Sequence, residues 1–142
     1  MSKAMIGVGI VIALQSTAVL ADDYKEATEA AYCSGVYQSG IENVRRSDPK
    51  ANTNDKEMKQ FRKQAFVEGA IRRQIIDVVT ASKMRDVGYA DANSCSQQVE
   101  RCAHQSTERR DQKVDDERNN RLFENCNRLA EPVCERAYKN CD

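Results

Sequence analysis

The sequence lacks the residues from which most metal and catalytic motifs are built. It has no tryptophan, a single histidine (His104) and no Cys-x-x-Cys pair among its 142 residues. Zinc sites need several cysteine or histidine ligands at short spacings, so we expect no metal and no other cofactor. Glycine-rich phosphate loops, His-x-x-x-His pairs and Gly-x-Ser-x-Gly elbows are also missing. We therefore predict that the protein is not an enzyme.

A surplus of charge of either sign is also lacking. The 22 basic residues are balanced by 22 acidic residues, which gives a formal net charge of +0 at pH 7. Proteins that bind nucleic acid or anionic membranes through bulk electrostatics carry a marked positive surplus. We therefore expect no nucleic-acid partner.

Long hydrophobic runs occur only at the start of the chain. Residues 1–21 contain one charge and an uncharged, mostly apolar run from Ala4 to Leu14. Val19 and Ala21 supply the small side chains that a signal peptidase requires. We interpret residues 1–21 as a cleaved signal peptide and residues 22–142 as a single domain with no stable membrane insertion. An uncleaved anchor is the alternative, because the apolar stretch approaches the length of a spanning helix.

The cysteines indicate the compartment. All six lie after residue 21, and an even number in an exported chain of this size implies disulfide bonds. Val, Ile, Leu and Phe make up only 18 of the 121 residues that follow the predicted signal. A core this thin gains most from covalent cross-links. We therefore predict a periplasmic or secreted protein with three disulfides.

The hydrophobic spacing indicates about four helices and no strands, which is an all-α fold. A first helix is predicted from about Asp23 to Arg46, followed by a loop around Pro49. Its buried face should carry the residues that recur at three- and four-residue spacing: Ala30, Cys33, Tyr37, Ile41 and Val44.

A second helix is predicted from Asn54 to Val87. Asn54 and Glu57 resemble a capping box, and Gly88 is placed to take the left-handed position after the helix end. Apolar residues cover more than half of its circumference, so we expect it to be the central element that touches two neighbours. Its main apolar face comprises Met58, Phe61, Ala65, Gly69, Ile76 and Val79.

A third helix is predicted to begin after Ser94 and a fourth to end at Cys141. Between them, residues 105–120 are highly charged and have one large apolar residue, Val114, which indicates a solvated helix or a mobile loop. Pro132 should kink the fourth helix or open a new one, because it removes a backbone hydrogen bond.

The cysteine spacing predicts a disulfide-stapled antiparallel hairpin in the C-terminal part. Two pairs have a spacing of seven residues: Cys95 with Cys102 and Cys134 with Cys141. On a helix the members of such a pair lie about 10 Å apart on one face, too far to bond to each other. If the last two helices are antiparallel, the two pairs face each other. The predicted disulfides are Cys95–Cys141, Cys102–Cys134 and, by elimination, Cys33–Cys126.

Two known classes of protein offer partial resemblances. The hairpin is similar in principle to the twin-cysteine helical hairpins of the mitochondrial intermembrane space, although the six intervening residues here differ from the spacing in that class. In composition the chain is similar to insect odorant-binding proteins, which are small helical domains with six cysteines. Neither resemblance assigns site residues.

Two functions are compatible with these features. The first is a binding or interaction module whose rigid scaffold presents a charged surface to an unknown protein partner, in the cell envelope or outside the cell. The alternative is a carrier of a small apolar ligand, held between the first and second helices around Phe61, Phe66 and Ile75. Arg72 falls near the apolar face of the second helix and is a candidate for the polar edge of such a surface. We favour the binding module, because so few large apolar residues barely fill one core.

Overall fold

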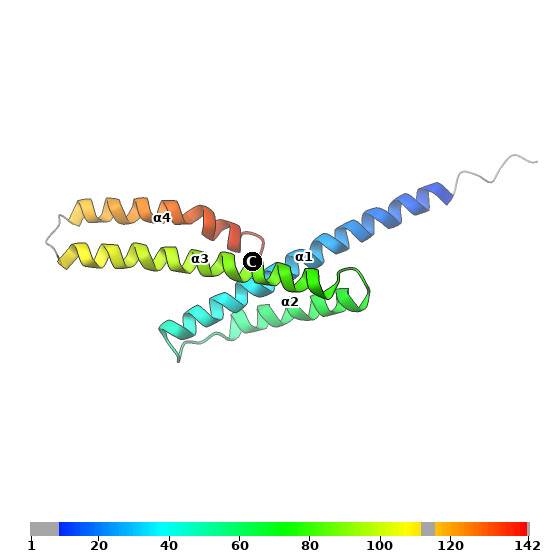
Figure 1. The fold of residues 1–142 in the computed structure, drawn as a ribbon, viewed down its shortest axis with the longest axis horizontal. Helices are drawn as coiled ribbons and strands as arrows, with labels where there is room; N and C mark the ends of the chain where they lie inside the picture. The colour runs from blue at the N-terminus through cyan, green and yellow to red at the C-terminus, as the bar shows by residue number, and fades with distance from the viewer. Residues whose placement is uncertain (1–8, 112–115, 142) are drawn as a thin grey trace, which may run out of the picture.

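Four α-helices make up the described part of the protein, residues 9–111 and 116–141 of a computed structural model. In chain order they are α1 (Gly9–Ser47), α2 (Asn54–Arg72), α3 (Val78–Asp111) and α4 (Asp116–Tyr138) (Figure 1). The described residues contain no strand, and the all-α prediction is confirmed.

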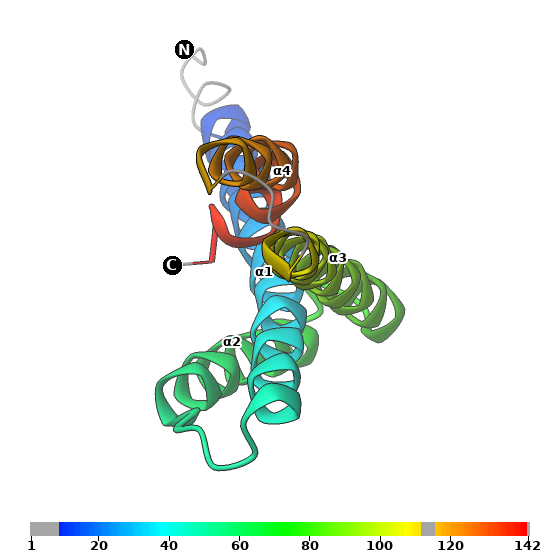
Figure 2. The same cartoon turned by 90° about the vertical axis from the view of Figure 1, so that its left-hand side faces the viewer.

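The helices α1 and α3 are the central elements of the fold. They cross each other, α2 packs against α1, and α4 lies beside α3 (Figures 1 and 2). The prediction that the second helix is central is wrong, because α2 makes its extensive contacts with α1 alone. The N-terminal part of α1 extends beyond the other helices, as Figure 1 shows.

The predicted buried face of α1 is confirmed, with four of its five residues buried and Val44 half-buried. The buried ones are Ala30, Cys33, Tyr37 and Ile41. Additional buried alanine and serine residues widen this face, and their small side chains let neighbouring helices approach closely. Among the described side chains the first buried one is Ala27, so cleavage after Ala21 would leave the whole buried face in place.

The helix α2 begins at Asn54, as predicted, but without the predicted capping box. Thr53 precedes the helix and makes no side-chain cap. The Glu57 carboxylate forms an ion pair with Arg45 near the end of α1, and Arg45 also donates a hydrogen bond to the Thr53 hydroxyl (3.1 Å). The start of α2 is therefore tied to the end of α1.

The predicted helix from Asn54 to Val87 is wrong, because the structure divides it into two. The first part, α2, ends at Arg72, and Gln74 then takes a left-handed φ of 59°. A new helix starts after Asp77, whose carboxylate accepts the N–H of Thr80 (2.8 Å) and the Thr80 hydroxyl (2.7 Å). This pair of hydrogen bonds satisfies groups that a helix start leaves free, and it fixes the beginning of α3.

The predicted apolar face of the second helix is mostly wrong, although its member Ile76 is buried. Met58, Phe61 and Val79 are 52%, 66% and 77% exposed. The buried residues of α2 are instead Val67 and Ala70, which face α1. Within α2 the buried side is therefore a different one from the side that carries Met58 and Phe61. The left-handed turn at Gln74 then separates Val79 from both, because a helical period is not carried across it.

The helix α3 continues through the two residues that were predicted to lie at helix ends, Gly88 and Ser94. Gly88 is a packing position, because its Cα lies against the backbone of Tyr32 in α1. The predicted third helix is thus the C-terminal half of α3.

The helices α3 and α4 form an antiparallel hairpin, but the predicted disulfide pairing is wrong. The bonds are Cys33–Cys141, Cys95–Cys134 and Cys102–Cys126, and no cysteine is free. The predicted pairs, Cys95–Cys141 and Cys102–Cys134, are both centred on residue 118, so they would have placed the turn of the hairpin there. Arg118 instead lies within α4. The helices actually turn between Asp111 and Asp116, so α4 is shifted by about two turns along α3.

The charged segment 105–120 is helical wherever it is described. Helix α3 extends to Asp111 and α4 starts at Asp116, and the described side chains near both ends are exposed. Val114 lies outside the described residues. Pro132 lies inside α4, which continues past it to Tyr138, so it opens no new helix.

Candidate functional site

A groove lies between α2 and α3 and has α1 as its floor. The two helices leave their short connection at residues 73–77 and diverge on either side of α1 (Figure 2). The groove has a volume of about 340 Å³, opens to solvent, and has Ala31 and Ser34 on its floor. The wall from α2 consists of Gln64, Val67, Glu68 and Ile71. The wall from α3 consists of Val78, Ala81, Ser82 and Arg85. We call this feature the α2–α3 groove.

The floor of the α2–α3 groove contains a hydroxyl without a partner. Ser34 is 2% exposed, and its Oγ has no hydrogen-bond partner among the described residues. Buried polar groups are nearly always hydrogen-bonded, and leaving one unsatisfied costs about 1 to 3 kcal/mol. Because the Oγ atom is itself buried, a guest in the groove does not reach it, and the unsatisfied hydroxyl remains an internal cost of the fold.

The two walls carry opposite charges. Glu68 lies on the α2 wall and has no ion-pair partner in the part of the chain that the structure describes. Arg85 lies on the α3 wall, with its Nε 4.0 Å from the Asp86 carboxylate, at the limit of an ion pair. Val67 and Ile71 make the lower part of the groove apolar. The arrangement therefore suits an amphipathic guest with an apolar side and charges of both signs.

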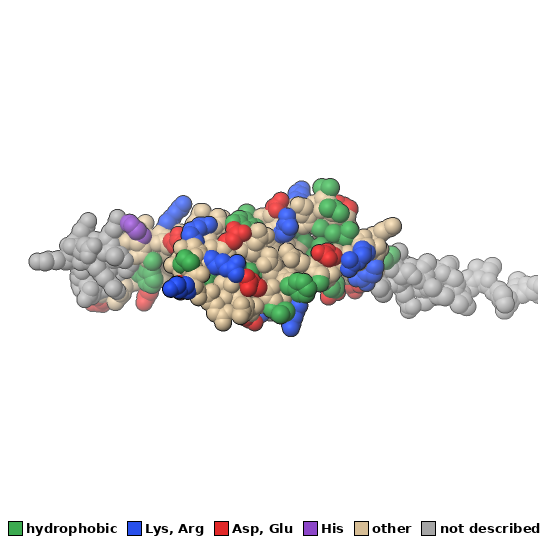
Figure 3. Space-filling model, turned by 90° about the horizontal axis from the view of Figure 1, so that it is seen from below, with side chains coloured by type: hydrophobic (Ala, Val, Ile, Leu, Met, Phe, Trp, Pro, Cys, Tyr) green, Lys and Arg blue, Asp and Glu red, His purple; other side chains and the backbone are tan. Residues whose placement is uncertain are grey.

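An exposed aromatic side chain extends the α2 wall. Phe61 precedes Gln64 by three residues and Glu68 by seven, so helical geometry places all three on one face of α2. Its ring is 66% exposed. Exposed aromatic residues beside a groove are common anchors in protein interfaces. On the face seen in Figure 3, several hydrophobic side chains lie in the part of the molecule that holds α2 and the start of α3.

The four residues predicted to form a ligand or interaction surface do not come together in one site. Phe61 is exposed beside the α2–α3 groove, and Arg72 is exposed at the end of α2. Phe66 and Ile75 are half-buried and pack against the alanine-rich core between α1 and α2. None of the four lines the groove itself.

Sequence reasoning predicted none of the ten groove residues as a site, including the polar and charged residues Ser34, Glu68 and Arg85. Ser34 lies on the buried face of α1, one residue after the predicted Cys33. Nothing in its sequence context distinguishes it from a serine that caps its own backbone. Glu68 and Arg85 face one groove only because the chain turns at Gln74, and that turn was not predicted.

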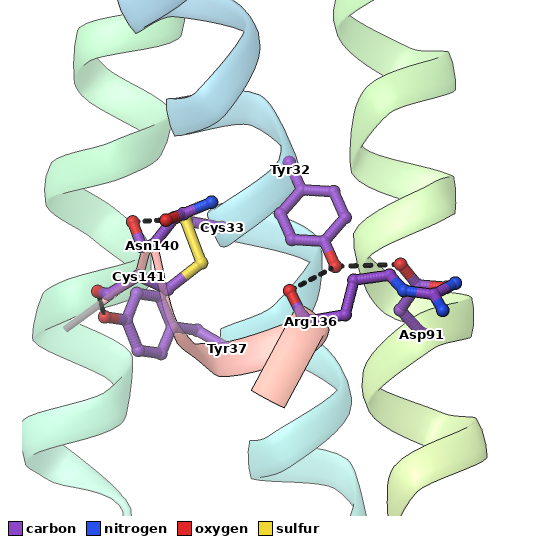
Figure 4. The surroundings of a disulfide bond; sticks show 7 residues. All are labelled: Tyr32, Cys33, Tyr37, Asp91, Arg136, Asn140 and Cys141. Carbon is purple, nitrogen blue, oxygen red and sulfur yellow. Dashed lines mark hydrogen bonds between the residues drawn. A yellow bond between two sulfur atoms is a disulfide. The ribbon is translucent and has the colours of Figure 1, made fainter. Parts of the chain in front are cut away.

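A second cluster joins α1, α3 and the end of α4 (Figure 4). The Tyr32 hydroxyl donates a hydrogen bond to Asp91 Oδ2 at 2.8 Å, and the carbonyl oxygen of Arg136 lies 3.2 Å from the same hydroxyl. Burial raises the pKa of Tyr32 far above its ordinary value, and the hydrogen bond to Asp91 adds to the rise. The phenol therefore stays protonated and holds three helices together, which indicates a structural role.

The chain end is fastened to α1 beside this cluster. Cys33 is bonded to Cys141, and the Tyr37 hydroxyl donates to the carbonyl oxygen of Cys141 (Figure 4). The Cys33 sulfur also lies 3.4 Å from the carbonyl oxygen of Asn140, a contact without a proton because a disulfide sulfur carries none. We call Cys33, Tyr37 and Cys141 the C-terminal clasp.

Among the described residues, no group of three His, Cys, Asp or Glu side chains is arranged to hold a metal ion. No described helix combines the length and the hydropathy needed to cross a bilayer. No protein-family model matches the sequence, and no curated protein or solved structure is significantly similar to it. The function must therefore be inferred from the groove itself.

Proposed function

We propose that the protein is an exported binding module that docks an amphipathic helix of a protein partner in the α2–α3 groove. The observation that carries this proposal is the groove itself, with its apolar lower part and its two oppositely charged walls. Export is supported by the predicted signal at residues 1–21 and by the three disulfides, which persist in oxidising compartments. We place the protein in the periplasm or outside the cell.

The shape of the groove favours a helix as the guest. Two helices that diverge over a third leave the position that a fourth helix fills in a four-helix bundle. Helix-in-groove recognition uses apolar anchors at three- and four-residue spacing on one side of the guest. Val67 and Ile71 would receive these anchors, and Phe61 would cover the guest at the rim. Glu68 and Arg85 would select a guest with basic residues along one flank and acidic residues along the other.

Photo-crosslinking in the native host tests the proposal. A photoreactive amino acid replaces Gln64 on one wall or Ser82 on the other, and Lys139, which is exposed after the end of α4, serves as the control position. We expect both wall positions, but not the control, to give one discrete adduct with a protein other than a second copy of this chain. Mass spectrometry of that adduct should map the cross-link to an amphipathic helical segment. If neither wall position gives a protein adduct, the proposal is wrong.

A pair of matched variants checks that the adduct forms through the groove and not through non-specific association of exposed apolar residues. Phe61→Asp removes the exposed aromatic group at the rim, and Leu129→Asp removes a 79% exposed apolar residue on α4. Both side chains are exposed, so both variants should fold. We expect the first variant to lose the adduct and the second to keep it. Equal yields from both variants would contradict the proposal.

The carrier of a small apolar ligand is the second candidate, and one observation favours it. A volume of about 340 Å³ lies within the range of small-molecule sites. Native mass spectrometry of the oxidised protein from its host would reveal a stoichiometric small molecule that is released on denaturation. Such a mass, together with no protein adduct from the groove, would favour the carrier over the docking module.

A further inference from the structure

The outer face of α3, away from both α1 and α4, carries unusually exposed valines. Val78, Val79 and Val87 are 64%, 77% and 42% exposed. Valine loses side-chain freedom in a helix, so an exposed helical valine contributes little to the stability of a monomer. These valines lie on the exposed side of α3 together with Ser82, Lys83, Asp86 and Ala90. A group of exposed apolar side chains on an otherwise polar helix is typical of a surface that another molecule covers.

Four residues of this surface form a single stripe. Val79, Lys83, Asp86 and Ala90 follow one another at spacings of four, three and four residues, which is the pattern of a helix–helix seam. We call these four residues the outer α3 stripe. Its two ends are apolar, and its centre carries one positive and one negative side chain.

The outer α3 stripe is complementary to itself in the antiparallel direction. A two-fold axis midway between Met84 and Arg85 places Lys83 of one copy opposite Asp86 of the other, and this contact occurs twice. The same axis places Val79 opposite Ala90 at each end of the stripe. Two-fold symmetry always pairs a patch with itself, so a stripe that matches its own reverse fits such an interface.

The charges at the centre are available for this pairing. Lys83 has no ion-pair partner within residues 9–111 and 116–141. Asp86 has only Arg85, its chain neighbour, at 4.0 Å. A second copy would give each of them an opposite charge at the middle of the interface, where ion pairs are best shielded from water.

We propose that the outer α3 stripe is the interface of a symmetric, antiparallel homodimer. The partner is a second copy of this chain, and the contact is made by helix α3 alone. One helix pair buries less area than the roughly 1,200 to 2,000 Å² of a stable complex, so the dimer is reversible. Val78 and Ser82 also border the α2–α3 groove, so the second copy lies along the outer edge of its α3 wall. The inference rests on the surface of α3 and does not require the proposed function.

Charge-reversal variants in sedimentation experiments test the dimer. The full oxidised protein is measured at low salt from about 10 µM to about 1 mM, because weak interfaces associate in this range and salt screens exposed charges. Lys83→Glu places two acidic groups opposite each other in both contacts, and Asp86→Lys places two basic groups there. We expect each single variant to weaken dimerisation at least tenfold relative to the wild type. Lys50→Glu, in the loop before α2, is the control and should dimerise like the wild type.

Two recombinations of these changes make the test specific to the antiparallel pairing. An equimolar mixture of the two single variants has both contacts attractive, so it should form heterodimers although neither variant dimerises alone. The double variant Lys83→Glu/Asp86→Lys should likewise recover the homodimer. A wild type that is monomeric at about 1 mM would overturn the proposal. Single variants that dimerise like the wild type, or a mixture that stays monomeric, would overturn it as well.

Discussion

Gly35 of α1 and Gly88 of α3 bring the backbones of the two longest helices into direct contact. A Cβ atom on Gly35 would lie 1.9 Å from the carbonyl oxygen of Arg85, and one on Gly88 would lie 2.0 Å from the carbonyl oxygen of Tyr32. Both neighbours are backbone atoms, which cannot rotate away as a side chain can. The crossing of α1 and α3 therefore depends on the absence of a side chain at both positions.

Replacement of either glycine should destabilise the protein strongly. We expect Gly35→Ala and Gly88→Ala each to lower the free energy of unfolding by about 3 kcal/mol or more, because the helices must separate to admit the methyl group. Thermal unfolding followed by circular dichroism under oxidising conditions measures this loss. Gly69→Ala is the matched control, since nothing lies within 4 Å of its Cβ position and alanine favours a helix by up to about 1 kcal/mol. A Gly35→Ala protein as stable as the control would contradict the crossing.

The turn between α2 and α3 gives a second prediction. Gln74 has a φ of 59°, a region that is unfavourable for residues with a Cβ and worst for β-branched ones. We expect stability to decrease in the order Gln74→Gly, wild type, Gln74→Val, with a gain of up to about 1 kcal/mol for glycine. At Arg73, whose φ is −83°, the change to glycine should give no gain. Urea unfolding of the four proteins checks this order, and a Gln74→Val variant as stable as the wild type would contradict the left-handed conformation of Gln74.

The three disulfides should differ in their effect on stability. Cys33–Cys141 spans 108 residues, and Cys102–Cys126 spans 24. In the chain-entropy model the longer loop restricts the unfolded chain more, which makes the first bond worth about 1 kcal/mol more. Replacing both cysteines of each pair by serine and comparing urea midpoints measures the difference. A greater loss from the shorter loop would show that contacts in the hairpin outweigh loop closure.

The raised pKa of Tyr32 predicts how stability depends on alkaline pH. The folded protein keeps the phenolic proton at a pH where the unfolded chain releases it. The stabilisation is therefore complete below the ordinary tyrosine pKa of about 10 and is lost as the pH rises further. Tyr89, which donates to Glu42 at 2.5 Å and also has a raised pKa, acts in the same direction.

Phenylalanine variants separate these contributions. Tyr32→Phe should be less stable than the wild type at pH 7, and its stability should fall less steeply above about pH 10. Tyr24→Phe, which alters a 46% exposed tyrosine, should leave both quantities unchanged. Urea unfolding with short exposure to alkali checks both variants. Identical slopes for the two would show that Tyr32 ionises normally.

Much of α1 was predictable from the sequence, and its boundary with α2 was too. The apolar residues from Ala30 to Ile41 repeat with the helical period, and this face is the one that is buried. The start of α2 at Asn54 was predicted from Asn54 and Glu57 as a capping box, so the position is right although that cap is not formed. These features are local, since spacing and turn residues within a few positions determine them.

The sequence contains a local signal for the break between α2 and α3, but stronger signals for a continuous helix outweighed it in the prediction. Asp77 with Thr80 three residues later is the signature of a helix start, and it forms the observed cap. The apolar run around Ile76 and the absence of glycine or proline at the turn favoured one continuous helix instead. The groove residues could not be predicted, because their proximity is a consequence of this break.

The role of the two crossing glycines and the register of the disulfides depend on parts of the chain that are distant in sequence, so neighbouring residues do not determine them. Gly88 was interpreted as a helix end because a glycine that ends a helix and one that admits a neighbouring helix look the same in sequence. In the hairpin, Cys95 and Cys102 could pair either with Cys141 and Cys134, which are seven residues apart, or with Cys134 and Cys126, which are eight apart. Both spacings are close to two helical turns, so helix geometry alone accepts either pairing. Only the position of the turn between α3 and α4 decides between them.

Peptide mapping of the oxidised protein without reduction is the most direct test of the fold that creates the groove and the crossing. The structure predicts three cross-linked peptides, which join Cys33 to Cys141, Cys95 to Cys134 and Cys102 to Cys126. Peptides that join Cys95 to Cys141 and Cys102 to Cys134 would instead shift α4 by two turns along α3. They would also remove the C-terminal clasp from α1 and contradict the structure.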